Sequence, residues 1–384
     1  MEAYFDNSAT TRCCPEAAEI MMRTLTEDFG NPSAMHRKGV EAERYVREAA
    51  ETIAALLKIQ PKEILFTSGG TESDNLALIG GAFANQRAGK HIITTSVEHP
   101  AVENPAAFLE EQGFEVTRLP VDHRGVVRLD ALTQALREDT ILVSVMMVNN
   151  ETGAVMPISE IAEIVHRKNP RILFHVDAIQ GFGKYRIFPS RMGIDLLSVS
   201  GHKFHGPKGV GFLYIRNGVK VRPMILGGGQ QNGMRSGTDN VPGIAGMAAA
   251  AEKVCTDMEK KTEHLRCLKK RMAEGLQEIP EVRINGMALE EGAPHILSVT
   301  VPGVRSEVLL HALEEKSIYI SAGSACSSHK RRPSAVLTAM GLPKADIEST
   351  VRISFSEENT MEEVDYALQS FGEIVPLLRR FSRR

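Results

Sequence analysis

Lys203 is the residue whose type and neighbours most directly suggest chemistry. It lies between two short apolar runs in the segment 196–215, LLSVSGHKFHGPKGVGFLYI, with Ser200, His202 and His205 close to it in sequence. Most lysines are exposed surface charges, which is one interpretation of this one. A lysine held among apolar strands instead loses hydration, so its pKa falls and its neutral amine can attack a carbonyl group. Pyridoxal phosphate (PLP) is the common cofactor that uses a lysine in this way.

Three further positions supply what PLP needs, each near the end of an apolar run. The segment 66–78, FTSGGTESDNLAL, has a glycine pair before a helical pattern, and backbone amides at such a turn can hold a phosphate. Asp177 ends the run RILFHVD and can pair with a protonated pyridine nitrogen, while His99 follows HIITTS and can stack on the ring. The ordinary alternatives are a plain turn, a helix-capping aspartate and a surface histidine. Ligands of open α/β sheets gather at such strand ends, which favours a cofactor site.

The composition sets the scale of the protein and argues against several classes. With 384 residues, 42% of them hydrophobic, the chain is long enough for two domains. A formal net charge of -3 argues against direct binding of nucleic acid. The start, MEAYFDNSATT, has no basic segment before an apolar one, and no apolar run reaches membrane-spanning length. We therefore expect a cytoplasmic protein that engages no membrane.

The cysteines favour neither a zinc cluster nor a disulfide scaffold. The five of them, at positions 13, 14, 255, 267 and 326, form no CxxC pair and no repeating framework. We expect reduced thiols. A metal site built on His202 and His205 is also disfavoured, because no third and fourth ligand with suitable spacing is evident.

The order of predicted elements indicates an α/β protein. Apolar spacing over 40–59 predicts an amphipathic helix, and the long stretch 248–277 reads as helical and charged. Short β-rich runs alternate with helical or loop stretches, which favours a parallel sheet flanked by helices. These runs are EILFTS (63–68), HIITTS (91–96), ILVSVMMV (141–148), RILFHVD (171–177) and LLSVS (196–200). After about residue 240 the sequence changes to a long charged helical stretch followed by a mixture of helical and β-rich segments, which predicts a smaller α+β domain.

Together the motifs resemble the PLP-dependent cysteine desulfurases of the NifS/IscS type, within the class V aminotransferase group. The matching segments follow the family's order over nearly the whole chain: YFDNSATT, GNPSAMHRKG, TSGGTES, VEHPAV, VNNETG, HVDAIQGFGK, SGHKFHGPKGVGFLY, GGGQQNGMRSGTDN, SAGSACSS and VRISFS. The resemblance implies the type I fold of PLP-dependent transferases, with a mostly parallel central sheet flanked by helices. It also implies three parts: an N-terminal segment (1–15) packing on the small domain, a large cofactor-binding domain (16–250), and a small C-terminal domain (251–384) that carries the loop with the catalytic cysteine.

The resemblance assigns roles to residues of the cofactor site. Lys203 becomes the Schiff-base lysine, His99 stacks on the ring, and Asp177 pairs with the pyridine nitrogen. Gln180 reaches the ring hydroxyl, and Asn149 lies near cofactor and substrate. The residues implied as phosphate ligands are Gly70, Thr71, Ser200 and His202, joined by Thr238, which in the family comes from the neighbouring subunit. A homodimer with shared sites is therefore expected.

Cys326 decides the expected reaction. A lone cysteine is usually a small, buried, inert thiol, but the context SAGSACSSHKRRPS is small, polar and then basic, which suggests an exposed loop and a lowered thiol pKa. The family's catalytic cysteine stands in a matching GSAC context. Arg352, in VRISFS, is then the expected clamp for the substrate carboxylate, although a plain strand-edge arginine is the alternative.

The expected activity is conversion of L-cysteine to L-alanine, with the sulfur held as a persulfide on Cys326. Its acceptor would be a protein of iron–sulfur cluster assembly or of tRNA thiolation. Three alternatives stay open. A selenocysteine lyase would use nearly the same residues, an aminotransferase of this fold would need no loop thiol, and a relay subunit without catalysis would act by binding partners.

Overall fold

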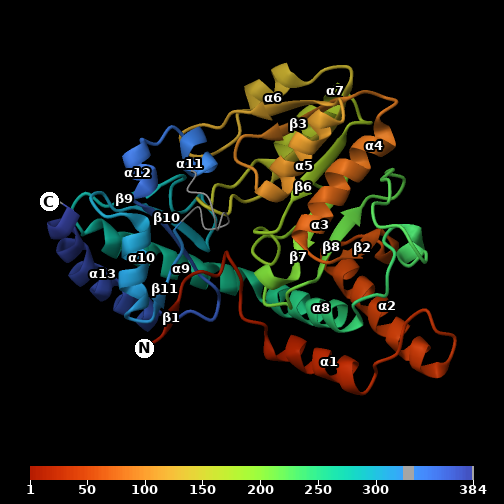
Figure 1. Ribbon diagram of the computed structural model, residues 1–384, viewed down its shortest axis with the longest axis horizontal. Helices are drawn as coiled ribbons and strands as arrows, with labels where there is room; N and C mark the ends of the chain where they lie inside the picture. Colours follow the sequence, from red (N-terminus) through yellow and green to blue (C-terminus); the bar gives the residue numbers. More distant parts are fainter. Residues whose placement is uncertain (323–332, 383–384) are drawn as a thin grey trace.

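The computed structural model describes residues 1–322 and 333–382 (Figure 1). Its largest element is a seven-stranded sheet in the order β2-β8-β7-β6-β5-β3-β4. Strands β4, β3, β5, β6 and β7 are mutually parallel, whereas β8 runs antiparallel to both of its neighbours. The bounds are β2 Ile64–Thr67, β3 His91–Thr95, β4 Glu115–Leu119, β5 Thr140–Met146, β6 Leu173–Asp177, β7 Leu196–Ser200 and β8 Gly211–Ile215. The predicted α/β fold with a mostly parallel sheet is confirmed.

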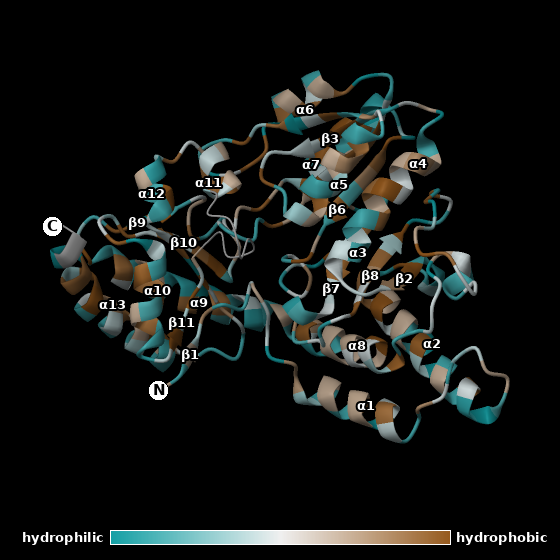
Figure 2. Cartoon of the chain, in the orientation of Figure 1, coloured by the Kyte–Doolittle hydropathy of each residue, from teal (hydrophilic) through white to brown (hydrophobic). Residues whose placement is uncertain are grey.

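Alternating side chains of this sheet enter two separate apolar cores. Ile92 belongs to one core and its neighbour Ile93 to the other, and Leu173 and Phe174 are divided in the same way. One face is covered by α5 (Pro100–Glu111), and the other by α7 (Ile158–Lys168) together with α2 (Arg37–Leu57) and α8 (Val241–Cys255). Because both faces are buried, the central strands read as continuous apolar runs, which is why their sequences could be recognised (Figure 2).

The elements match the predicted pattern with two main differences, one helix break and one strand. Helix α2 (Arg37–Leu57) covers residues 40–57 of the predicted 40–59, and α1 (Pro15–Thr26) packs against α8 beside it. The stretch 248–277 is not one helix: α8 (Val241–Cys255) ends before Asp257, whose φ of +52° is left-handed, and α9 (Met258–Gln277) then begins. Strand β4 was not predicted, because it lies at the sheet edge with mostly partly exposed residues and no apolar run.

A second, smaller unit lies at the left of Figure 1. An antiparallel sheet in the order β12-β10-β9 packs with α9, α10 and α13, and β1 pairs in parallel with β11. The bounds are β1 Ala3–Tyr4, β9 Arg283–Asn285, β10 Ile296–Thr300, α10 Ser306–Glu314, β11 Ile318–Tyr319, α11 Ala335–Ala339, α12 Lys344–Glu348, β12 Thr350–Ser354 and α13 Met361–Ser382. This unit has its own core, formed mainly by α9, α10, α13 and their strands. The division at residue 250 stays a prediction: buried residues of α8 belong to the large core and those of α9 to the small one, but Ile296 of β10 and Val336 and Leu337 of α11 also belong to the large core.

Short helical elements complete the large unit. They are α3 Gly70–Asn75, the π-helical turn η2 Leu76–Gly80, α4 Gly81–Asn85, α6 Leu129–Ala135, and the 3-10 turns η1 Pro61–Glu63, η3 Gly201–Lys203 and η4 Gln231–Gly233. Within residues 1–322 and 333–382, no helix has the length and apolar character needed to cross a bilayer.

The N-terminal segment contacts both units. Its first residues, Ala3 and Tyr4, pair with β11 of the small unit, while the bounds 1–15 of the segment stay a prediction. Further along, the backbone amides of Thr11 and Cys14 donate to the carbonyl oxygens of His202 and His205, both at 2.9 Å. The segment thus runs from the small unit to the turn that carries the lysine (Figure 1).

Candidate active site

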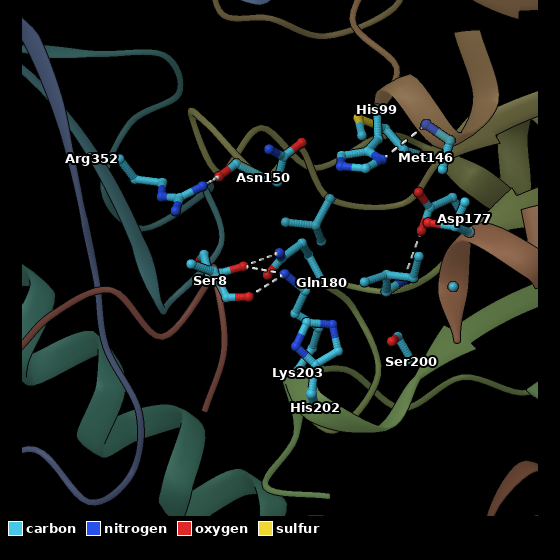
Figure 3. A pocket seen from close by; sticks show the side chains of 16 residues that line it. Ser8, His99, Met146, Asn150, Asp177, Gln180, Ser200, His202, Lys203 and Arg352 are labelled. Carbon is cyan, nitrogen blue, oxygen red and sulfur yellow. Dashed lines mark hydrogen bonds between the residues drawn. The ribbon is translucent and has the colours of Figure 1, made fainter. Parts of the chain in front are cut away.

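A cavity of about 350 Å³ lies where the carboxyl ends of β5, β6 and β7 face the small unit (Figure 3). Its size is in the range of small-molecule sites. Nine of the residues predicted from the sequence line it: Gly70, Thr71, His99, Asp177, Gln180, Ser200, His202, Lys203 and Arg352. Parallel strands end at one edge of a sheet, so residues distant in sequence meet there.

Lys203 ends the 3-10 turn that follows β7. Its Nζ donates to the carbonyl oxygens of Ser8 at 2.7 Å and Ala9 at 2.8 Å, and Nε2 of Gln180 donates to the same Ser8 oxygen at 3.0 Å (Figure 3). The N-terminal segment therefore holds the lysine amine at the cavity wall. These two carbonyls were not recognised from the sequence, since backbone acceptors leave no signal in residue type.

Asp177 is the last residue of β6 and is buried. Its Oδ1 accepts from the amide of Ile179 at 2.9 Å. Burial raises the pKa of Asp177 to about 6, against the lowering effects of that amide and of Lys203. A buried carboxylate of raised pKa gains most from a cationic N–H partner, and a protonated pyridine nitrogen is such a partner.

Two further acids lie near Asp177 in the interior. Asp74 of α3 is fully buried, and burial, followed by the charge of Asp177, raises its pKa well above the usual range. Glu98 is partly exposed as a residue, but its Oε2 is buried without a hydrogen-bond partner in the described part of the chain. Burial raises the pKa of Glu98 to about 8 despite hydrogen bonds from Thr95 and from the Met146 amide. Glu98, with a pKa of about 8, is therefore mostly neutral near pH 7, and burial disfavours the charged form of Asp74. Asp177, with a pKa of about 6, is mostly ionised at that pH.

His99 is the N-cap of α5 and lines the cavity. Its Nδ1 accepts from the amide of Ala101 at 3.1 Å, so the ring proton is on Nε2. Burial and then the charge of Lys203 lower the pKa of His99 to about 4, which keeps the ring neutral. His202 is similar: burial lowers its pKa to about 4, and its Nδ1 lies 3.2 Å from the Thr10 hydroxyl.

The glycines beside the cavity permit close approach of a ligand to the backbone. Gly69, with φ of +149°, is the N-cap of α3, and Gly70 lines the cavity. A Cβ on Gly70 would lie 2.2 Å from Cδ1 of Ile179 and 3.4 Å from Cβ of Ser200. A side chain at position 70 would collide with Ile179, so this close packing beside the cavity requires glycine.

Arg352 extends from β12 of the small unit across the cavity from Asp177 (Figure 3). Its Nη2 donates to Oδ1 of Asp6 at 2.7 Å and its Nη1 to the carbonyl oxygen of Asn150 at 2.8 Å. The side chain is only 6% exposed, and Nε has no hydrogen-bond partner among the described residues. A buried guanidinium with a spare donor at a cavity fits a carboxylate ligand.

Two predicted residues, Asn149 and Thr238, lie outside the cavity lining. Asn149 does not line the cavity, because its buried amide is used inside its own loop: Nδ2 donates to the Val97 carbonyl at 3.0 Å and Oδ1 accepts from the Glu151 and Thr152 amides. The following residue, Asn150, lines the cavity instead. Thr238 is exposed and outside the cavity lining. Cys326 lies outside the described residues.

The four other cysteines are remote from the cavity lining and unbridged. Burial raises the pKa of Cys13 and Cys14, and it raises the pKa of Cys255 to about 11, so none of these three is set up as a thiolate. Among residues 1–322 and 333–382, no three histidine, cysteine or acidic side chains are grouped to hold a metal ion.

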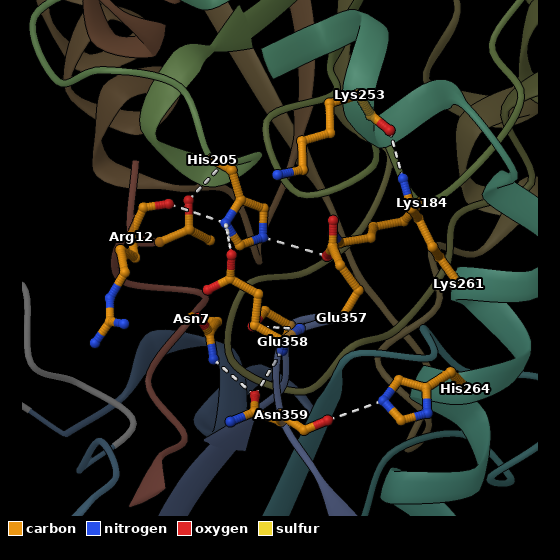
Figure 4. Close-up of polar contacts among 12 residues, drawn as sticks. Asn7, Arg12, Lys184, His205, Lys253, Lys261, His264, Glu357, Glu358 and Asn359 are labelled. Atoms are coloured by element: carbon orange, nitrogen blue, oxygen red, sulfur yellow. Dashed lines mark hydrogen bonds and ion pairs between the residues drawn. The ribbon is translucent and has the colours of Figure 1, made fainter. Parts of the chain in front are cut away.

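A polar junction beneath the cavity joins the lysine turn to the small unit (Figure 4). His205, with a left-handed φ of +66°, places Nδ1 2.9 Å from the Arg12 carbonyl oxygen and Nε2 3.2 Å from Oε2 of Glu357. Lys184 lies 3.4 Å from the same oxygen. Burial alone would raise the pKa of Glu357, but Lys184 and His205 hold it well below its usual range. These charges fix the far end of the turn that presents Lys203.

The residues present fit PLP. The cavity combines an amine (Lys203), a buried carboxylate (Asp177), a neutral ring (His99) and a glycine turn (Gly70), which match its aldehyde, ring nitrogen, ring face and phosphate.

Known proteins match the chain over almost its whole length. The family model of the class-V aminotransferases matches residues 3–367. The cysteine desulfurase IscS of Methanosarcina thermophila is 48% identical over 379 residues, which cover 99% of this chain and 93% of that protein. A solved NifS-like protein is 41% identical with a TM-score of 0.93, covering 98% of this chain and all of the other. A structure of SspA in complex with cysteine is 36% identical with a TM-score of 0.82, covering 93% of this chain and all of the other.

The extent of these matches and the residues gathered in the cavity lead to one assignment, and the family implies dependence on PLP. The chain belongs to the class-V aminotransferase family, in its group of NifS/IscS-type cysteine desulfurases.

Proposed function

We propose that this protein is a PLP-dependent cysteine desulfurase that converts L-cysteine to L-alanine and holds the sulfur as a persulfide on Cys326. The observation that carries the proposal is that Lys203, Asp177 and Arg352 line one cavity. Family membership and the relatives' names support it, as does the cysteine bound in the SspA structure.

Five residues are proposed to hold PLP. Lys203 would bond its aldehyde carbon, Asp177 its ring nitrogen, His99 its ring face and Gln180 its ring hydroxyl, while the Gly70 turn would receive the phosphate. Thr71, Ser200 and His202 line the same cavity and complete the proposed phosphate contacts. When bound, PLP supplies an electron sink for negative charge that develops at the substrate Cα.

Lys203 is proposed to move the proton at Cα. A neutral amine is a competent general base, and the carbonyls of Ser8 and Ala9 hold Nζ at the cavity wall. The expected fall in the pKa of this lysine stays a prediction. His99 cannot compete as an acid near pH 7, because its pKa lies near 4 and its Nδ1 is occupied by a backbone amide.

Arg352 is proposed to bind the substrate carboxylate with its remaining N–H donors. Because Asn150 lines the cavity and Asn149 does not, Asn150 is proposed to contact the substrate. The carboxylate would then lie on the side of the cavity opposite Asp177 (Figure 3). This fixes the amino acid by its two backbone groups and leaves the side-chain sulfur for attack.

Cys326 is proposed as the sulfur acceptor. Ser321, five residues before it in the sequence, exchanges two backbone hydrogen bonds with Arg352, at 2.7 and 3.0 Å. Five residues of chain span at most about 18 Å, a length that is compatible with the proposed attack in a cavity lined by Arg352. The thiolate would attack the substrate sulfur: an S–S bond forms, the Cβ–S bond breaks with its electron pair moving to carbon, and protonation there gives alanine. Atoms balance without an external oxidant.

We further propose a homodimer in which Thr238 reaches the partner's phosphate site. Thr238 is exposed in the single chain, and large apolar side chains lie exposed near the cavity, namely Phe108, Met224, Ile225 and Leu226. Met224 and Phe108 line a hollow that also contains Thr71 and His99 of the cavity. Exposed apolar groups of this kind mark interaction surfaces. A sulfur-accepting protein of iron–sulfur assembly or tRNA thiolation, and a cytoplasmic location, stay predictions.

The test is release of alanine and sulfide from L-cysteine, with a thiol reductant present, by the parent and by Cys326→Ala. Equal amounts of both products from the parent, and neither from the variant, would support the proposal. The bound cofactor is measured by absorbance in both proteins, since loss of the cofactor would imitate loss of the thiol. Undiminished products from Cys326→Ala would remove this cysteine from the reaction.

A further inference from the structure

Asp6 lies behind the proposed carboxylate clamp and outside the cavity lining. Its Oδ1 accepts from Nη2 of Arg352 at 2.7 Å. The backbone on both sides of Asp6 is fixed to β12, because the Ser354 amide donates to the Phe5 carbonyl at 2.7 Å and the Asn7 amide donates to the Ser354 carbonyl at 3.3 Å. The carboxylate is therefore presented to the guanidinium by a backbone that cannot easily shift.

Two of the N–H donors of Arg352 have acceptors in this chain, one carboxylate and one backbone carbonyl. Asp6 takes one hydrogen of Nη2 and the Asn150 carbonyl takes one of Nη1. Nε, which is buried, has no partner in the described part of the chain. A guanidinium has five N–H donors in a rigid plane, so fixing two of them fixes the direction of the other three.

We propose that Asp6 is a positioning residue that sets the orientation of Arg352, and through it the affinity for the carboxylate of the substrate. This inference rests on the proposed function, since it takes Arg352 to be the carboxylate clamp. Asp6 acts on binding and not on the chemistry at sulfur.

The same segment also holds the lysine. Ser8 and Ala9, two and three residues after Asp6, accept the hydrogen bonds of Lys203 Nζ. One rigid stretch thus contacts both the group proposed to bind the carboxylate and the group proposed to act at Cα. Removing the Asp6 side chain loosens the first contact while the backbone carbonyls still maintain the second.

A competing role has the opposite sign. If Asp6 only neutralised Arg352 and competed with the ligand, its removal would strengthen carboxylate binding. If it positions Arg352, its removal weakens that binding, and Asp6→Asn largely rescues it, because the amide oxygen of asparagine can still accept from Nη2.

The test uses the PLP-loaded protein and 3-mercaptopropionate, a thiol acid without an amino group. Its Kd is measured by titration calorimetry for the parent, Asp6→Ala, Asp6→Asn and the control Glu2→Ala, which removes an exposed acid of the same segment. We expect Kd to rise about tenfold in Asp6→Ala, because a charge-assisted hydrogen bond is lost. We expect Asp6→Asn and Glu2→Ala to stay within about threefold of the parent.

The kinetic constants for L-cysteine separate positioning from chemistry. Asp6→Ala should raise KM about tenfold, as it raises Kd, with kcat nearly unchanged. An unchanged or lower Kd in Asp6→Ala, or an equal rise in Asp6→Asn, overturns the proposal. Should Asp6→Ala fail to fold, Asp6→Asn alone decides: a parent-like Kd supports positioning, and a tighter one indicates competition. If the parent produced no alanine, the proposed function would be wrong. The calorimetric comparison would still test whether Asp6 affects carboxylate binding.

Discussion

Gly211 and Gly69 touch through their backbones: a Cβ on Gly211 would lie 2.8 Å from Cα of Gly69 and 2.5 Å from the carbonyl oxygen of Val199. Gly211 begins β8 and is paired with Thr67 of β2 on one side and Ser200 of β7 on the other. The loops that follow β2 and β7 both line the cavity. They therefore start on either side of Gly211, which has no side chain.

Gly211→Ala should lower both stability and cofactor affinity. The added methyl group meets backbone rather than flexible side-chain ends, and overpacking of this kind costs about 1–3 kcal/mol. The free energy of unfolding and the Kd for PLP measure the two effects. Gly372→Ala is the control, because a Cβ at this position inside α13 would meet no neighbouring group within 4 Å. This substitution should raise the free energy of unfolding by about 0.5–1 kcal/mol. Equal effects of the two substitutions would contradict the close contact.

Asn149→Ala should lower the stability of the protein, whereas Asn150→Ala should weaken substrate binding. The first removes a buried amide that binds Val97 and the Glu151 and Thr152 amides, so it should destabilise the protein by about 1–3 kcal/mol. The second removes a side chain at the cavity wall and should raise KM for L-cysteine while the protein keeps its Tm. Denaturant unfolding and steady-state kinetics on both variants separate the two roles, and exchanged outcomes would restore Asn149 as the ligand.

Glu98→Gln should flatten the dependence of stability on pH. The pKa of Glu98 is about 8 in the folded protein and about 4.3 when unfolded. The folded protein thus binds the extra proton between these values, and its stability falls as pH rises through the window. Tm should decline between pH 5 and 8 by about 3 °C less in the variant than in the parent. Glu111→Gln, an exposed neighbour on α5, serves as the control and should follow the parent curve.

Asp177→Asn should lower the activity while the covalent bond between Lys203 and PLP is retained. The amide cannot stabilise a protonated ring nitrogen, so alanine release should fall by a factor of about 100 or more. The bond to Lys203 should survive, because the lysine and its Ser8 and Ala9 partners are untouched. Borohydride reduction followed by peptide mass measurement reports that bond. A variant that keeps full activity would show that the ring nitrogen needs no anion.

Much of the site could be predicted because the chemistry lies at strand ends. Lys203, Asp177 and His99 each follow an apolar run, and the ends of parallel strands meet at one edge. The choice between Asn149 and Asn150 could not be predicted, since only the tight turn decides which of two identical side chains points inward. Asp6 gave no signal either, because its contact with Arg352 joins residues 346 positions apart.

Other features could not be predicted from the sequence pattern, because they depend on which side chains are buried or on the backbone angles of one residue. The acidic character of Asp74 and Glu98 suggests surface positions, yet Asp74 is fully buried with Oδ1 3.5 Å from Nε2 of His175, and Oε2 of Glu98 is buried without a hydrogen-bond partner in the described chain. The break between α8 and α9 depends on one left-handed residue, Asp257, within a stretch whose composition is helical throughout.

The contacts of the N-terminal segment have a consequence for synthesis of the chain. Asp6, Ser8 and Ala9 leave the ribosome long before Arg352, the partner of Asp6, which is made 346 residues later. The large sheet can form early from its own residues, whereas the wall that holds both the lysine amine and the guanidinium is completed only after β12 has emerged. Nascent chains interrupted before β12 would have an incomplete site, so a partly made protein cannot acquire the full activity.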